Sequence, residues 1–186
     1  MRRRTALPIS ALALGLALAG CSSSDTDTAT TETETATESS AAPSAAPDPL
    51  VTQAAEEYQA YAVDQSDQLV TVVKVLTDAV RAGDLQAAQE AYAPSRVPWE
   101  RIEPLAGLVE EIDGLVDARV DDFAGVDDPA FTGWHRLEYL LFEQNTTDGG
   151  AQFADQLDAN IATLNEQMPT LEVAPTDVAV GAAELI

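Results

Sequence analysis

The chain has 186 residues, and its 32 acidic residues against nine lysines and arginines give it a formal net charge of −23. Nucleic acid is a poor partner for such a surface, because phosphate binding needs clustered Lys and Arg, whereas cations are natural partners. The single cysteine excludes an internal disulfide and a thiolate metal cluster.

The first twenty residues have the pattern of a secretory signal. Three arginines at positions 2–4 precede an apolar run from Ala6 to Ala19 that is too short to span a bilayer as a mature anchor. The run ends in Leu18-Ala19-Gly20-Cys21, which resembles the bacterial lipobox. We predict that residues 1–20 are a lipoprotein signal peptide and that Cys21 is lipidated, which would anchor the protein on the extracytoplasmic side of the bacterial membrane. The alternative is a stray cysteine after an ordinary signal peptide.

Residues 21–47 consist almost entirely of Ser, Thr, Ala, Pro, Asp and Glu. Such a composition cannot bury enough apolar surface to offset chain entropy, so we predict a disordered acidic tether. The remaining residues, 48–186, are enough for one domain.

The domain is predicted to begin with one long helix. Asp48 and Pro49 form a helix cap and a first-turn proline, and apolar residues then recur every three or four positions until Gly83. Asp84 is the predicted cap of a second helix over residues 85–93. Three prolines are then expected to bend or interrupt the helical path: Pro94, Pro98 and Pro104.

The later elements are also predicted to be helical. A polar stretch covers residues 110–122, and a helix with Trp134, Leu137 and Leu141 follows it. Two more amphipathic helices are expected over residues 153–168 and 177–186. Because no run alternates with period two, we predict an all-α, up-and-down helical bundle.

The only histidine stands three residues before a carboxylate, in the sequence Gly133-Trp134-His135-Arg136-Leu137-Glu138. Positions i and i+3 share a helix face, so His135 and Glu138 can point at one ion. This is half of a metal site. The alternative is a hydrogen-bonded histidine at the edge of the core.

A second carboxylate pair, Glu100 and Glu103, has the same spacing, and Asp117 follows within reach of a bundle turn. One nitrogen and several carboxylate oxygens suit iron, manganese, calcium or zinc better than cuprous copper. The alternative is a solvated helix face whose glutamates pair with Arg96 or Arg101. For the neighbouring charged residues we expect surface or capping roles for the aspartates and charge neutralisation for the arginines: Asp121, Asp122, Arg119 and Arg136.

Four segments resemble, in order and spacing, the imelysin-like domain of the EfeO and EfeM family. They are Tyr92-Ala93-Pro94-Ser95-Arg96, Trp99-Glu100-Arg101-Ile102-Glu103-Pro104, Asp117-Ala118-Arg119-Val120-Asp121-Asp122 and Phe131-Thr132-Gly133-Trp134-His135-Arg136-Leu137-Glu138. The resemblance extends from about residue 50 to the last residue. With only the tether before the helices, the chain is similar to the shorter EfeM kind, which lacks a cupredoxin domain.

The resemblance implies an extracytoplasmic component of an EfeUOB-type system that captures ferrous or ferric iron beside an EfeU-like permease and an EfeB-like haem peroxidase. It implies a bundle duplicated into two halves, of which this chain would hold about the first. It also implies five metal contacts, carried over from the matching positions: Glu100, Glu103, Asp117, His135 and Glu138. Zinc, calcium, manganese and copper are the alternative cations.

Two other functions compete with iron capture. Imelysin-like proteins have been classed with peptidases, but a zinc peptidase needs three protein ligands, an open position and a general base, and this chain has one histidine. We therefore expect no catalysis. The other alternative is a tethered acidic helical module that binds a partner without any specific metal.

Overall fold

The structure is a computed structural model, and it describes residues 48–186. The predicted signal peptide (1–20), the tether (21–47) and Cys21 lie outside the described residues. All statements about the fold below concern the described part.

The first helix, α1 (Pro49–Ala82), has the predicted ends. Asp48 caps it, because its carboxylate accepts a hydrogen bond of 2.8 Å from the Leu50 amide. Gly83 ends it in the left-handed region at φ 75°, where a glycine is not penalised. The buried residues of α1 recur every three or four positions, so one stripe of the helix faces the core.

The second helix, α2 (Leu85–Ile102), is continuous, so of the bend or interruption predicted at Pro94 and Pro98 the interruption is wrong. Asp84 caps it through a 3.0 Å hydrogen bond from the Ala87 amide. Each proline removes one backbone donor, but the buried face of α2 packs along α1 and its burial offsets that loss. The third proline of the series, Pro104, stands at the start of a 3-10 helix, η1 (Glu103–Leu108).

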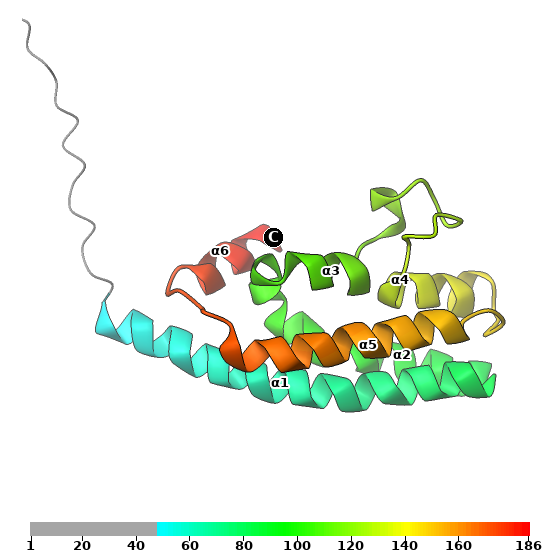
Figure 1. The fold of residues 1–186 in the computed structure, drawn as a ribbon, viewed down its shortest axis with the longest axis horizontal. Coiled ribbons are helices and arrows are strands. Elements are labelled where there is room, and N and C mark those ends of the chain that lie inside the picture. Colours follow the sequence, from blue (N-terminus) through cyan, green and yellow to red (C-terminus); the bar gives the residue numbers. More distant parts are fainter. Residues whose placement is uncertain (1–47) are drawn as a thin grey trace, which may run out of the picture. The chain divides into compact units, whose positions relative to one another are not determined.

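Helices α2 and α5 (Ala151–Gln167) both lie along α1 (Figure 1). Helix α5 runs antiparallel to α1, since Thr77 donates to Asp158 at 2.9 Å near one end and Asn165 donates to Ser66 at 3.1 Å farther along. These three long helices form the base of the domain.

The shorter elements cover this base on one side (Figure 1). Helix α3 (Glu110–Val116) is followed by a 3-10 turn, η2 (Val120–Asp122), and then by α4 (Gly133–Glu138). The expected helix after residue 133 changes at Tyr139 into a π turn, η3 (Tyr139–Glu143), which sequence periodicity did not indicate.

The chain continues from α5 through the 3-10 turn η4 (Met168–Thr170) to α6 (Asp177–Glu184), which packs on η1. Residues 48–186 contain no strand, so the all-α prediction is confirmed. No helix among these residues is both long and apolar enough to cross a membrane. The largest fully buried side chains come from both layers: Leu69, Leu76, Trp99, Ile102, Leu105, Phe131, Trp134, Leu137, Leu141, Leu157, Ile161 and Leu164.

Gly133, the first residue of α4, is a point where only glycine fits. It has a φ of 72°, and a Cβ there would lie 2.2 Å from the carbonyl oxygen of Val116. We expect Gly133→Ala to lower the free energy of unfolding by roughly 2 kcal/mol or more, because it adds both backbone strain and a backbone clash.

Urea denaturation followed by circular dichroism measures this loss. The matched control is Gly107→Ala, where an added Cβ meets nothing within 4 Å. The control should change stability by less than about 0.5 kcal/mol. Equal effects in the two variants would contradict the close approach at Gly133.

Candidate metal site

The site begins with one face of α2. Tyr92, Arg96 and Glu100 are spaced by four residues, so their side chains follow one another along the helix. The Arg96 guanidinium donates to the Glu100 carboxylate from Nε at 2.9 Å and from Nη2 at 2.7 Å. Glu100 is half exposed, whereas the Arg96 side chain retains only 14% of its exposure.

Asp117, directly after α3, is the buried anion at the centre of the site. Its carboxylate accepts hydrogen bonds from both terminal nitrogens of Arg96, one of them at 3.1 Å, and from Trp99 Nε1 at 2.8 Å. Burial alone would raise the pKa of Asp117. The nearby His135, Arg96 and Trp99 outweigh burial and lower this pKa to about 2, so Asp117 is an anion at neutral pH.

The structure places His135 and Glu138 together on α4. The imidazole Nδ1 lies 2.7 Å from Glu138 Oε2, which fixes the ring and leaves Nε2 directed toward Asp117. Nε2 is 3.3 Å from Asp117 Oδ1, but it is buried and makes no aligned hydrogen bond with any described residue. An imidazole held by a carboxylate at one nitrogen, so that the other nitrogen can face an ion, is the usual arrangement of a metal-binding histidine.

Glu103 extends the acidic group at the start of η1. Burial, followed by the charges of Glu100 and Asp117, raises its pKa. Together with those two residues it lines a cavity of about 620 Å³. The five predicted ligands therefore lie around two adjacent cavities, and Glu100 borders both.

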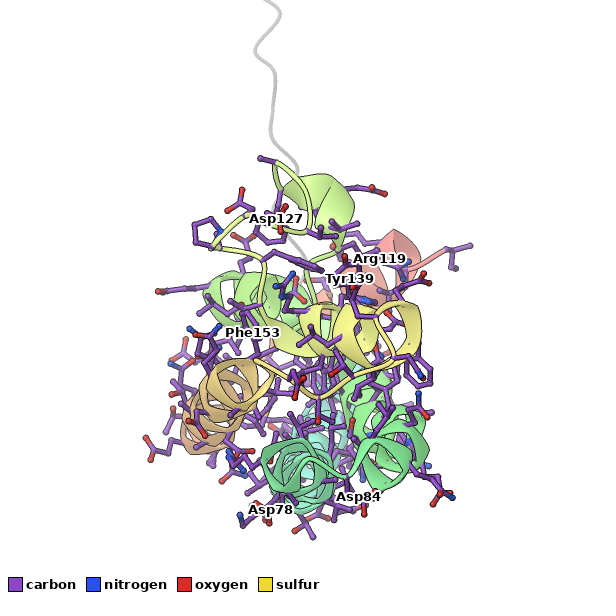
Figure 2. All side chains as sticks on the ribbon, turned by 90° about the vertical axis from the view of Figure 1, so that its right-hand side faces the viewer. Asp78, Asp84, Arg119, Asp127, Tyr139 and Phe153 are labelled. Carbon is purple, nitrogen blue, oxygen red and sulfur yellow. The ribbon has the colours of Figure 1, made fainter. Side chains whose placement is uncertain are left out.

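The first of these cavities has a volume of about 630 Å³ and lies between α2, the segment around η2, and α4 with η3. His135 and Glu138 form one wall, and Tyr92 and Arg96 form another. Two further lining residues, Arg119 and Tyr139, are labelled in Figure 2, above the ends of the long helices.

Arg96 occupies the position where a cation would meet these carboxylates. Its guanidinium bonds Asp117 and Glu100 at once, and no group of three or more His, Asp or Glu side chains within residues 48–186 is arranged to hold an ion. An ion that used Asp117 and Glu100 together would have to displace the guanidinium. The geometry is thus that of an acidic site neutralised by an internal arginine.

The structure confirms one expectation for the flanking charged residues and contradicts another. Asp121 and Asp122 are exposed, and Asp122 accepts a hydrogen bond from the Arg119 amide, a capping role as expected. The charge-neutralising role of Arg136 is wrong. Its guanidinium lies 4.7 Å from the centre of the Phe153 ring and donates to the Val126 carbonyl, and it forms no ion pair with any residue of the described segment.

Sequence reasoning missed two residues of the cavity, Tyr92 and Tyr139. Tyr92 is 8% exposed, and its hydroxyl has no hydrogen-bond partner among the described residues. The sequence signal that could have found it is its helical spacing, because Tyr92 precedes Arg96 by four residues and Glu100 by eight. Tyr139 reaches the cavity from the π turn, for which the sequence offered no signal.

The fold and the site define an all-α protein with a partly buried acidic site that contains one imidazole. Residues 54–185 match the imelysin family, peptidase family M75, and the chain belongs to this family. The predicted imelysin-like domain is thereby confirmed.

Several curated relatives are named as iron uptake system component EfeO. The chain is 48% identical to the protein of Escherichia coli O157:H7 over 130 residues, which are 69% of this chain and 35% of that relative. It is 47% identical over the same coverage to the proteins of Escherichia coli K12 and Shigella flexneri. The chain spans about a third of the length of these relatives.

Removing the Arg96 charge tests how much its ion pair with Asp117 contributes to the free energy of unfolding. In the metal-free protein we expect Arg96→Gln to lower the free energy of unfolding by about 3 kcal/mol, because it leaves the buried Asp117 carboxylate without its main cationic partner. Arg119→Gln, at an exposed arginine, is the control and should cost less than about 0.5 kcal/mol. Chemical denaturation in the presence of a chelator measures both. A loss no larger than the control would mean that the Arg96 pair contributes nothing to folding.

The titration of His135 provides a second test. Asp117 and then Glu138 raise its pKa above 6.5, although burial opposes them. Protonated His135 therefore stabilises the metal-free fold below pH 6.5, and this contribution is lost as the pH rises through the raised pKa. Asp117→Asn should lower the pKa of His135. Because the chain has one histidine, a single imidazole NMR signal in an untagged protein reports it. An unchanged pKa would show that Asp117 does not act on the ring.

Proposed function

We propose that the protein is a membrane-anchored, extracytoplasmic iron-binding component of an EfeUOB-type uptake system, which captures iron and delivers it to a permease. The observation that carries the proposal is the buried Nε2 of His135, which makes no aligned hydrogen bond and lies 3.3 Å from the Asp117 carboxylate, with Glu138 holding the other ring nitrogen. The names and the 47–48% identity of the EfeO relatives support iron as the cargo.

The proposed ligand set combines one imidazole with carboxylates from three elements. His135 and Glu138 come from α4, Asp117 follows α3, and Glu100 and Glu103 come from the junction of α2 and η1. Such a mixture of nitrogen and oxygen donors suits ferrous or ferric iron and also accepts zinc, manganese, calcium or copper. Arg96 neutralises the carboxylates until a cation replaces it.

The remaining parts of the proposal come from the sequence. Lipidation of Cys21 after a signal peptide would hold the protein at the outer side of the membrane, and residues 21–47 would act as the tether. An EfeU-like permease and an EfeB-like haem peroxidase are the proposed partners. The domain over residues 48–186 is proposed to be about the first half of a duplicated bundle.

Catalysis is not part of the proposal, despite the peptidase name of the family. The zinc-dependent hydrolysis of peptides usually requires three protein ligands and a separate general base, and the only histidine of the chain already belongs to the proposed binding site. The second candidate is an acidic interaction module without a specific metal. It is favoured by one observation, the occupation of the carboxylates by Arg96.

Metal titration of the full chain separates these functions. We expect saturable calorimetric binding of iron, and a loss of affinity of at least about 100-fold in a His135→Ala, Glu138→Ala double variant, because it removes two ligands. Glu56→Ala, an exposed carboxylate on α1, is the control and should bind as the unchanged protein does. Zinc and calcium are titrated in parallel.

Equal binding by the double variant and the control would mean that the ion meets only diffuse acidic charge. No saturable binding in the unchanged chain would favour the interaction module. Proteolysis of a peptide mixture by the metal-loaded chain, abolished in the double variant, would favour the peptidase.

A further inference from the structure

The hydroxyl of Tyr92 is a buried polar group that no aligned hydrogen bond satisfies. The side chain lies on the inner face of α2, is 8% exposed, and forms no aligned hydrogen bond through its hydroxyl with any described residue. Burial and then the neighbouring Glu138 carboxylate raise the pKa of this hydroxyl. Leaving such a buried group without a hydrogen bond costs about 1–3 kcal/mol of stability, so the presence of a tyrosine here needs an explanation. Phenylalanine would fill the same space without this cost.

The position of Tyr92 supplies a reason. Its side chain lines the 630 Å³ cavity together with His135, Glu138 and Glu100. Its ring is held edge-on by Phe142, with the ring centres 5.5 Å apart and the planes at 74°. The hydroxyl therefore belongs to the same cavity as the imidazole, on a side chain that packing fixes in place.

Three buried side-chain atoms among residues 48–186 make no aligned hydrogen bond, and two of them belong to residues that line this cavity: Tyr92 Oη and His135 Nε2. The third, Arg136 Nε, belongs to a guanidinium stacked over aromatic rings, and Arg136 itself does not line the cavity. Neither atom makes an aligned hydrogen bond, although Nε2 lies 3.3 Å from Asp117 Oδ1, and an oxygen donor and a nitrogen donor of this kind are groups that a bound cation would satisfy.

We infer that the phenolate oxygen of Tyr92 is a ligand of the captured ion and makes the site selective for ferric iron. This inference rests on the proposed function, since it requires an ion in the cavity. On binding, an Fe–O bond forms, the phenol O–H bond breaks, and the proton leaves to solvent, with no change in oxidation state. A hard anionic oxygen added to carboxylates favours a trivalent ion over ferrous iron or zinc.

Two other tyrosines, whose hydroxyls have hydrogen-bond partners, offer matched controls. Tyr139 lines the same cavity, but its hydroxyl accepts a 2.9 Å hydrogen bond from Gln144. Tyr58 lies outside the cavity and donates to the Arg101 carbonyl at 2.8 Å. Neither is assigned as a ligand.

The test uses the full chain and ferric citrate as the probe. A phenolate bound to ferric iron gives a charge-transfer band in the visible spectrum, which carboxylate and imidazole ligands alone do not give. We expect the band in the unchanged protein, in Tyr139→Phe and in Tyr58→Phe. Tyr92→Phe should lose the band and at least about tenfold in ferric affinity, with zinc affinity changed much less.

The outcomes separate this inference from the proposed function. Ferric binding that depends on His135 but shows no visible band would overturn the Tyr92 assignment and leave the proposed function standing. The same holds for a band that disappears in Tyr139→Phe instead. Absence of any iron binding would overturn both. Because Tyr92→Phe removes only an unpaired hydroxyl, its metal-free stability should not fall, and denaturation of the variant checks that it is folded.

Discussion

The buried ion pair between Arg96 and Asp117 is the interaction on which the site depends. It joins the middle of α2 to the end of α3, and Trp99 adds a hydrogen bond to the same carboxylate. Two charges this deeply placed are costly unless each is well bonded, and here both are. The pair therefore fixes the upper layer of short helices on the base of long ones, and it holds an anion beside the imidazole.

In the proposed capture of a cation, the same pair creates a competition between three positive species. Three cations are attracted to the Asp117 carboxylate: the Arg96 guanidinium, protonated His135 and a metal ion. Each of them either shares the carboxylate with the others or displaces them. The strength of the proposed capture would therefore be the difference between the affinity of the carboxylates for the metal and their affinity for Arg96. A modest net affinity would suit the proposed carrier, which has to pass its ion onward.

The helices of the base could be predicted because each is encoded locally. Asp48 and Asp84 cap α1 and α2, and Gly83 separates them, as the sequence indicates. Continuity through Pro94 and Pro98 could not be predicted, since it depends on packing against α1. The spacing of His135 and Glu138 predicted their contact, whereas the placement of Arg96 between Asp117 and Glu100 depends on how α3 folds back over α2. Tyr92 was missed because an aromatic residue at helical spacing is usually a core residue.

The tight contact between Gly133 and the Val116 carbonyl has a consequence for how α4 lies against the end of α3. A Cβ at residue 133 would lie 2.2 Å from the Val116 oxygen, so any larger residue would push the two segments apart. Asp117 follows Val116 directly, and His135 is two residues beyond Gly133, so such a shift would also separate the Asp117 carboxylate from the imidazole. The missing side chain at residue 133 therefore allows these two groups to lie 3.3 Å apart.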